Sequence, residues 1–251
     1  MGTLRGLEKF AIKTNTFLHY RHKDGDPNSI SSDIVRVLYE DRSGSIWVRC
    51  GEPWPSSQQN LGGLNNLNSR SGRFTRYFHK ELDSTSLTEN RVTAIYEDSQ
   101  DNFWVGTTGD GLHKMNRARG TFQRFHYNPA HTRDLSRPPV SYDTIQTYRG
   151  VDHITSFAED NSGRLWILTL AGGINVYDPA SKKISYYGTG SNSKDKLNDN
   201  MFWAAYRTRD FILWISPWGN NIYKIDPFEV KVPHTNLGKT VFPFGEDEAH
   251  S

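Results

Sequence analysis

The chain has 251 residues, of which 35% are hydrophobic and 13% aromatic, enough for one β domain or two small ones. Its 30 Lys and Arg residues nearly balance its 28 Asp and Glu residues, and the resulting net charge of +2 disfavours nucleic acid as a partner. The single cysteine, Cys50, excludes an internal disulfide framework and disfavours a cysteine metal site.

The first predicted elements are two short strands in residues 6–22. Two runs that contain Phe, Leu and Tyr are separated there by a polar turn. Short runs rich in aromatic and β-branched residues favour strands over helices. We interpret residues 6–22 as the second half of a four-stranded unit, because the same two-strand arrangement ends each unit that follows.

A repeated pattern begins at Asp33. An Asn or Asp is followed by an apolar strand, a Glu-Asp pair and, six residues after the pair, a tryptophan. The four copies cover residues 33–47, 90–104, 152–166 and 200–214, and the last has Arg207-Thr208 in place of Glu-Asp. Four copies at one internal spacing indicate a repeat.

The Glu-Asp pair and the tryptophan have structural interpretations. Asp41 to Gly44 and Asp160 to Gly163 have the Asp-first, Gly-last composition of a hairpin turn. We therefore expect the Asp to cap the turn and the Glu to be a solvated neighbour, and not a catalytic carboxylate pair. The four tryptophans are predicted to pack each sheet on the next: Trp47, Trp104, Trp166 and Trp214.

Each tryptophan is followed by a Gly-apolar start and two further strands, so one unit contains four antiparallel strands. Four strands in roughly 40 to 50 residues are typical of a propeller blade. The fold is predicted to be an all-β propeller without helices, with first strands at 35–40, 92–97, 154–159 and 202–207. The predicted division is a half blade (6–22), four blades (33–79, 90–127, 152–188 and 200–232) and one first strand of a further blade (240–247). Such a count predicts a piece of a larger propeller, an irregular closure or an assembly of copies.

The second and third copies carry a family resemblance. IYEDSQDNFWVGTTGDGL and FAEDNSGRLWILTLAGGINVYDP resemble the two-component regulator propeller repeat, and the resemblance covers nearly the whole chain. The other copies depart from it at Arg49-Cys50, Arg207-Thr208 and Pro217-Trp218. The resemblance implies a fragment of a seven-bladed propeller from the periplasmic sensor part of a hybrid two-component regulator. Known members sense oligosaccharides and pass the signal towards a histidine kinase.

The resemblance implies a location outside the cytoplasm, although the sequence predicts neither a signal peptide nor a membrane segment. No apolar run approaches the ~18 residues of a membrane span. Residues 1–16 also lack the apolar core of a signal peptide.

The predicted ligand site lies where loops enter the first strands and leave the second strands. Aromatic and arginine side chains there suit stacking on sugar rings and bonding to hydroxyls or carboxylates. The candidates are Trp54, Arg91, Tyr142, Tyr148, Arg149, His153, Trp203 and Trp218. Trp54, Trp203 and Trp218 differ most from the repeat. Ordinary packing in loops or between blades is the alternative for each aromatic residue.

Two other functions stay open at this point. A propeller enzyme of the lyase or lactonase type is one, but the chain has no HExxH, no GxSxG and no Cys/His pair at zinc spacing. His22, His79 and His126 recur at the ends of fourth strands on separate blades, which disfavours a joint metal site, so no catalytic residue, metal or cofactor is predicted. A protein-interaction scaffold, with a second copy or a neighbouring propeller domain as partner, is the other.

Overall fold

The computed structural model describes residues 1–52, 62–109, 111–126, 128, 130–131, 134–136, 153–188, 197, 199–219 and 221–225. Within these ranges every regular element is a strand, and none is a helix that could cross a membrane. The strands are β1 (Gly2–Thr3), β2 (Gly6–Ala11), β3 (Thr16–Tyr20), β4 (Val35–Glu40), β5 (Ile46–Cys50), β6 (Leu64–Asn68), β7 (Arg73–Tyr77), β8 (Val92–Glu97), β9 (Phe103–Thr107), β10 (Leu112–Asn116), β11 (Thr121–Phe125), β12 (Ile154–Glu159), β13 (Leu165–Thr169), β14 (Ile174–Asp178), β15 (Lys183–Tyr187), β16 (Phe202–Arg207), β17 (Leu213–Pro217) and β18 (Tyr223–Ile225).

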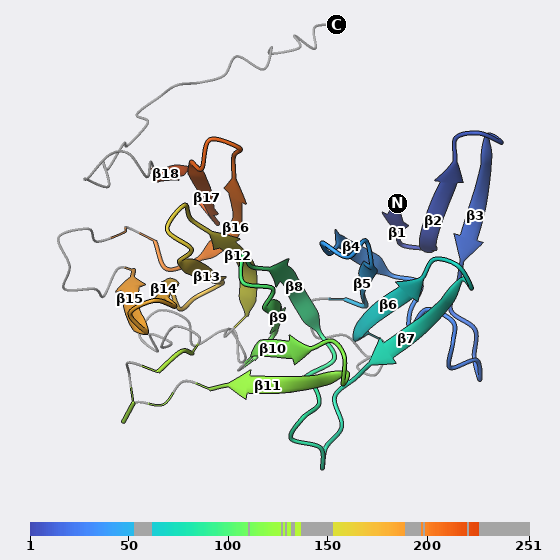
Figure 1. Ribbon diagram of the computed structural model, residues 1–251, viewed down its shortest axis with the longest axis horizontal. Helices are drawn as coiled ribbons and strands as arrows, with labels where there is room; N and C mark the ends of the chain where they lie inside the picture. Colours follow the sequence, from blue (N-terminus) through green and yellow to red (C-terminus); the bar gives the residue numbers. More distant parts are fainter. Residues whose placement is uncertain are drawn as a thin grey trace, which may run out of the picture.

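The strands form five antiparallel sheets in chain order. Three sheets have four strands, β4–β7, β8–β11 and β12–β15, and two have three strands, β1–β3 and β16–β18. The sheets lie side by side along an open arc, with β4, β8, β12 and β16 on its inner side (Figure 1). The predicted propeller fold is confirmed, and these inner strands occupy the predicted residues. The predicted strand at 240–247 lies outside the described residues.

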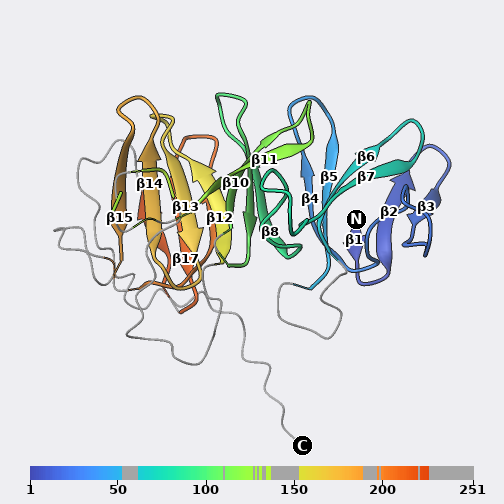
Figure 2. The same cartoon turned by 90° about the horizontal axis from the view of Figure 1, so that it is seen from below.

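The arc has two faces, which are seen edge-on in Figure 2. On one face, called the loop face here, β4, β8, β12 and β16 begin and β5, β9, β13 and β17 end. On the other, called the hairpin face, tight turns join each of these first strands to its second strand. Any ligand at the channel mouth of a propeller meets one of these two faces.

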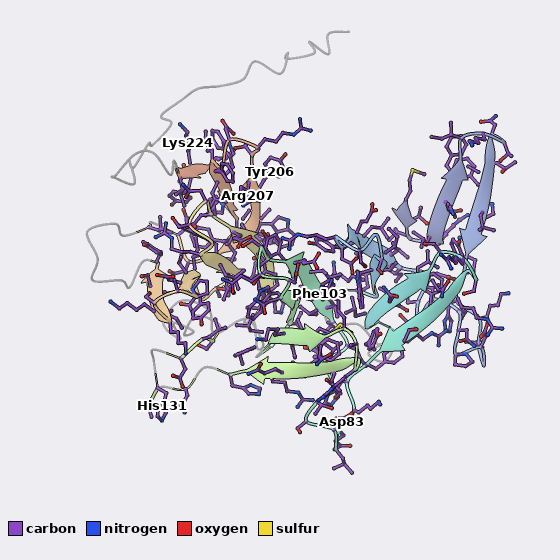
Figure 3. All side chains as sticks on the ribbon, viewed as in Figure 1. Asp83, Phe103, His131, Tyr206, Arg207 and Lys224 are labelled. Carbon is purple, nitrogen blue, oxygen red and sulfur yellow. The ribbon has the colours of Figure 1, made fainter. Side chains whose placement is uncertain are left out.

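The tryptophans pack neighbouring sheets together, as predicted. Trp47 of β5 contacts Phe103 of the next sheet, with ring centroids 4.6 Å apart, and Phe103 lies between the two sheets (Figure 3). Trp104 and Trp166 likewise belong to buried clusters that include residues of the following sheet. Trp214 departs from the prediction, since it is only partly buried.

The Asp of each Glu-Asp pair caps its turn, as predicted, and also binds the tryptophan. One Asp41 carboxylate oxygen accepts the backbone N–H groups of Ser43 and Ser45, both at 3.0 Å. The other oxygen accepts the Trp47 indole N–H at 2.8 Å. The same indole bond is 2.7 Å long at Asp98 and 2.9 Å long at Asp160. The six-residue spacing in the repeat therefore positions one buried hydrogen bond.

The prediction that the Glu is a solvated neighbour is wrong for two sheets. Glu97 and Glu159 are only 5% and 3% exposed. Glu97 accepts the backbone N–H of Arg42, at 2.7 Å, from the hairpin turn of the preceding sheet. Glu159 accepts the N–H of Ser99 at 2.9 Å and the Ser99 hydroxyl in the same way. These inter-sheet glutamate contacts exist because the turn of one sheet presents free amides to the first strand of the next.

The Asp or Asn that opens each of the first two copies joins two sheets at the loop face. The Asn90 side-chain oxygen accepts the backbone N–H of His79 at 2.6 Å, and its carbonyl accepts the N–H of Gly63 at 2.6 Å. The imidazole Nδ1 of His79 lies 2.8 Å from the Leu87 carbonyl oxygen. Asp33 and His22 repeat this arrangement one sheet earlier. These histidines therefore hold connections between sheets.

Candidate ligand-binding face

A shared backbone contact shapes the loop face. The residue before each first strand offers its carbonyl to the N–H of the residue after the second strand, at 2.8 to 3.0 Å. The four pairs are Ile34 with Gly51, Arg91 with Thr108, His153 with Leu170, and Met201 with Trp218. Equivalent positions thus carry very different side chains on the same backbone arrangement. Because the contact uses backbone atoms only, these side chains can differ between repeats without loss of the fold.

Four of the predicted site residues lie in the described part of the chain, and all four lie at the loop face. Arg91, His153 and Trp218 occupy the shared backbone pairs, and Trp203 follows the first residue of β16. The predicted residues Trp54, Tyr142, Tyr148 and Arg149 lie outside the described residues.

Trp203 and Trp218 form an exposed aromatic pair. Their ring centroids are 5.2 Å apart and their planes meet at 79°, an edge-to-face arrangement. Trp203 is 48% exposed and Trp218 is 57% exposed. Trp203 lies at a β-bulge, where Thr93 and Thr155 stand in the preceding sheets. The Thr155 hydroxyl donates to the Phe202 carbonyl of the next sheet at 2.7 Å. Trp203 has no hydroxyl group on its Cβ and does not make the equivalent bond.

Arg91 and His153 belong to other parts of the face. The Arg91 Nε donates to the carboxylate of Glu89, which also accepts the Thr108 hydroxyl. His153 is 8% exposed. Arg91 precedes β8, whereas Trp203 lies on β16 and Trp218 directly follows β17, with the β12 sheet between the two sites. The structure therefore brings Trp203 and Trp218 together, and it places Arg91 apart from them.

A charged group that sequence reasoning did not assign lies at the loop-face ends of β4 and β5. Arg36, at the bulge of β4, donates one nitrogen to both oxygens of Glu52 at 2.9 Å. Arg49 of β5 is 7% exposed, and its Nε has no hydrogen-bond partner. Burial, reinforced by repulsion from Arg36, lowers the pKa of Arg49 to about 10. The available signal was the departure of Arg49-Cys50 from the repeat.

No candidate metal-binding site is found in the described part of the chain. Among those residues, no three His, Cys, Asp or Glu side chains come together in a group that could hold a metal ion. The buried carboxylates Asp41, Asp98 and Asp160 are each engaged by an indole and by turn amides.

Two stretches of the sequence match the family described as two component regulator propeller, residues 86–109 and 149–171. They contain β8 with β9 and β12 with β13, including the bonded pairs Asp98–Trp104 and Asp160–Trp166. No curated protein sequence matches the chain.

Several solved structures share the fold. The extracellular domain of a proposed hybrid two component system from B. thetaiotaomicron aligns with a TM-score of 0.62 and 17% identity, over 89% of this chain and 25% of its own length. Virginiamycin B lyase from Staphylococcus aureus aligns with a TM-score of 0.54 and 14% identity, over 90% of this chain and 61% of its own. PorZ, a surface component of the type-IX secretion system of Porphyromonas gingivalis, aligns with a TM-score of 0.52 and 16% identity, over 82% and 27%.

At these identities the likeness shows the fold alone, and this chain spans only part of each relative. A sensor domain and a lyase share the architecture, so architecture does not choose between their functions. The arc of antiparallel sheets and the solved structures identify the fold as a β-propeller, and two of its sheets, with their Asp–Trp bonds, match the two component regulator propeller family.

Proposed function

We propose that this chain is a non-catalytic, ligand-binding module of an extracytoplasmic two-component sensor, and that it recognises an oligosaccharide at the loop face. The repeat family supports the sensor role. The exposed Trp203–Trp218 pair is the observation that supports the ligand class.

The tryptophan pair has the properties of a sugar platform. Large exposed aromatic rings cost free energy in water unless a partner covers them. The two rings are nearly perpendicular, so the face of one and the edge of the other border the same space. A pyranose ring in that space could stack its C–H groups on the aromatic face. The preceding sheets carry no aromatic residue at the equivalent positions, which are Arg36, Thr93 and Thr155 for Trp203, and Gly51, Thr108 and Leu170 for Trp218. The platform is therefore particular to this sheet and is not part of the repeated scaffold.

A non-catalytic role agrees with how the recurring carboxylates are used. Glu97 and Glu159 are buried and accept amides from neighbouring sheets. Asp98 and Asp160 accept indole and turn N–H groups. A general acid or base needs access to its substrate, and these groups are occupied by structural bonds.

The test is oligosaccharide binding by Trp203→Ala and Trp218→Ala variants, measured by calorimetry after a glycan panel has identified a ligand. Each substitution should weaken binding by about 1 to 3 kcal/mol, in the range of aromatic residues at binding hot spots. Tyr206→Ala is the matched control, because Tyr206 is an exposed aromatic residue of β16 near the hairpin face (Figure 3). Unchanged affinity in folded variants, or unfolding of both, would show that the two tryptophans are packing residues.

A further inference from the structure

Arg49 is a buried cation with an unsatisfied donor. Its residue exposure is 7%, and its Nε has no hydrogen-bond partner within the described part of the chain. The group stays charged at neutral pH, since burial lowers its pKa only to about 10. An isolated buried charge is strongly unfavourable, and proteins normally pair it. A group that carries negative charge would therefore gain more here than at a solvated arginine.

The position of Arg49 explains its burial. Arg49 pairs with Val37 of β4 and lies two residues after Trp47, on the side of β5 that faces the β8 sheet. The equivalent residue of the next sheet is Gly106, where an added Cβ would lie 2.7 Å from Ile154. The position is thus a narrow space between two sheets, close to where β5 ends at the loop face.

Arg36 and Glu52 complete a charged group around this space. Arg36 and Glu52 both act electrostatically on Arg49, with Arg36 repelling it and Glu52 attracting it. Glu52 is already bound to Arg36 through both carboxylate oxygens. Two guanidinium charges therefore face a single carboxylate, and one positive charge is left unbalanced.

We propose that Arg49, with Arg36 beside it, binds the carboxylate of an acidic ligand at the loop-face ends of β4 and β5. A guanidinium group fits a carboxylate through two parallel N–H bonds, and the Arg36–Glu52 pair shows that carboxylate oxygens reach this end of β4. A single negative charge balances the group, which favours a carboxylate over a doubly charged phosphate. This inference deepens the proposed function. It rests on that function only in taking the ligand to be a saccharide, which the carboxylate would make an acidic one.

The test compares D-glucuronate with D-glucose, which lacks the carboxylate, by NMR titration of the whole 251-residue chain, with acetate as the smallest probe. Glucuronate should bind and glucose should bind roughly tenfold more weakly or not at all. Arg49→Met keeps the length and removes the charge, and should weaken glucuronate binding by about tenfold or more. Arg42→Met is the matched control, because Arg42 pairs with Asp101 at the hairpin face, and it should bind glucuronate like the original protein.

Arg49→Met also has a folding readout. Since the substitution removes a buried charge with an unsatisfied donor, the variant should melt at the same temperature or higher. Glucuronate binding that survives in a folded Arg49→Met variant would overturn the proposal. Equal affinity for glucose and glucuronate, or no binding of either glucuronate or acetate to the original protein, would also overturn it.

The two proposals fail separately. A Trp203→Ala, Trp218→Ala double variant should keep acetate binding while it loses neutral oligosaccharides. If neutral oligosaccharides bind through the tryptophans and no carboxylate binds through Arg49, only the anion site is wrong. If acetate binds through Arg49 and no oligosaccharide binds, the proposed function is wrong and the anion site stands.

Discussion

His113 should make the stability of the protein depend on pH in the mildly acidic range. Its side chain is 0% exposed. The Nε2 atom accepts the Thr88 backbone N–H at 3.0 Å, and Nδ1 lies 3.1 Å and 3.2 Å from the carbonyl oxygens of Gly111 and Val105. The neutral ring therefore carries its proton on Nδ1. Burial lowers the pKa of His113 to about 4, because a second proton on Nε2 would be desolvated and would face an N–H donor.

The size of the pH-dependent change in stability follows from the pKa of His113 in the unfolded and in the folded chain. In the unfolded chain His113 takes up a proton as the pH falls below about 6.5, whereas in the folded chain it stays neutral until about 4. The unfolded state thus binds more protons in this window, and the free energy of unfolding falls as the pH is lowered. A shift of about 2.5 units corresponds to roughly 3 kcal/mol, present above about pH 6.5 and lost by about pH 4.

The repeat itself supplies the control substitution. Asn65 occupies the equivalent position of the preceding sheet, and its side-chain oxygen accepts the Ser31 N–H at 3.0 Å. His113→Asn should therefore keep an acceptor for Thr88 and remove the titrating group. Urea unfolding followed by tryptophan fluorescence, at about pH 7.5 and about pH 4.5, should show a smaller loss of stability in the variant than in the original chain. The same loss in both proteins would refute the assignment of the effect to His113.

Two further predictions concern the tryptophan positions. Asp98→Ala leaves the buried Trp104 indole N–H without its acceptor and should lower the free energy of unfolding in urea by about 2 to 4 kcal/mol. The loss should be smaller in a Trp104→Phe background. Strict additivity of the two stability losses would contradict the role of that bond. Trp166→Ala should cost about 3 to 5 kcal/mol in thermal unfolding, and more than Trp214→Ala, because only Trp166 is fully buried. Equal losses would contradict the difference in packing.

The strands could be predicted from the sequence because local chemistry sets them. The turn that begins at Asp41 and ends at Gly44 places a positive-φ glycine, with φ of 79°, at the residue that closes the hairpin. Asp101 takes the same place in the next sheet, with φ of 63°. These turns fix the register of both flanking strands, so the first strands could be predicted to the residue.

The glutamates and the charged group could not be predicted in the same way. Glu97 follows an alternating strand pattern that is compatible with solvent, and its acceptor role appears only when the Arg42 amide of the preceding sheet is placed beside it. Arg49 was visible as a departure from the repeat, but its burial depends on how closely the β8 sheet approaches β5. Both properties come from packing between sheets, which a pattern within one copy does not record.

The inter-sheet glutamate contacts connect each sheet only to the one before it, so the cohesion of the arc is a sum of nearest-neighbour terms. At the boundary between β12 and β16 the glutamate is replaced by Arg207, whose guanidinium has no acceptor for a turn amide and lies over Phe211 of its own hairpin, 5.4 Å from the ring centre. This boundary therefore lacks the glutamate–amide contact of the other two, and the Ser156 hydroxyl accepts the Ala205 N–H across it at 3.1 Å. The sheet β16–β18, with its tryptophan pair, is joined to the arc through this bond and through the buried cluster that contains Trp166 and Phe202.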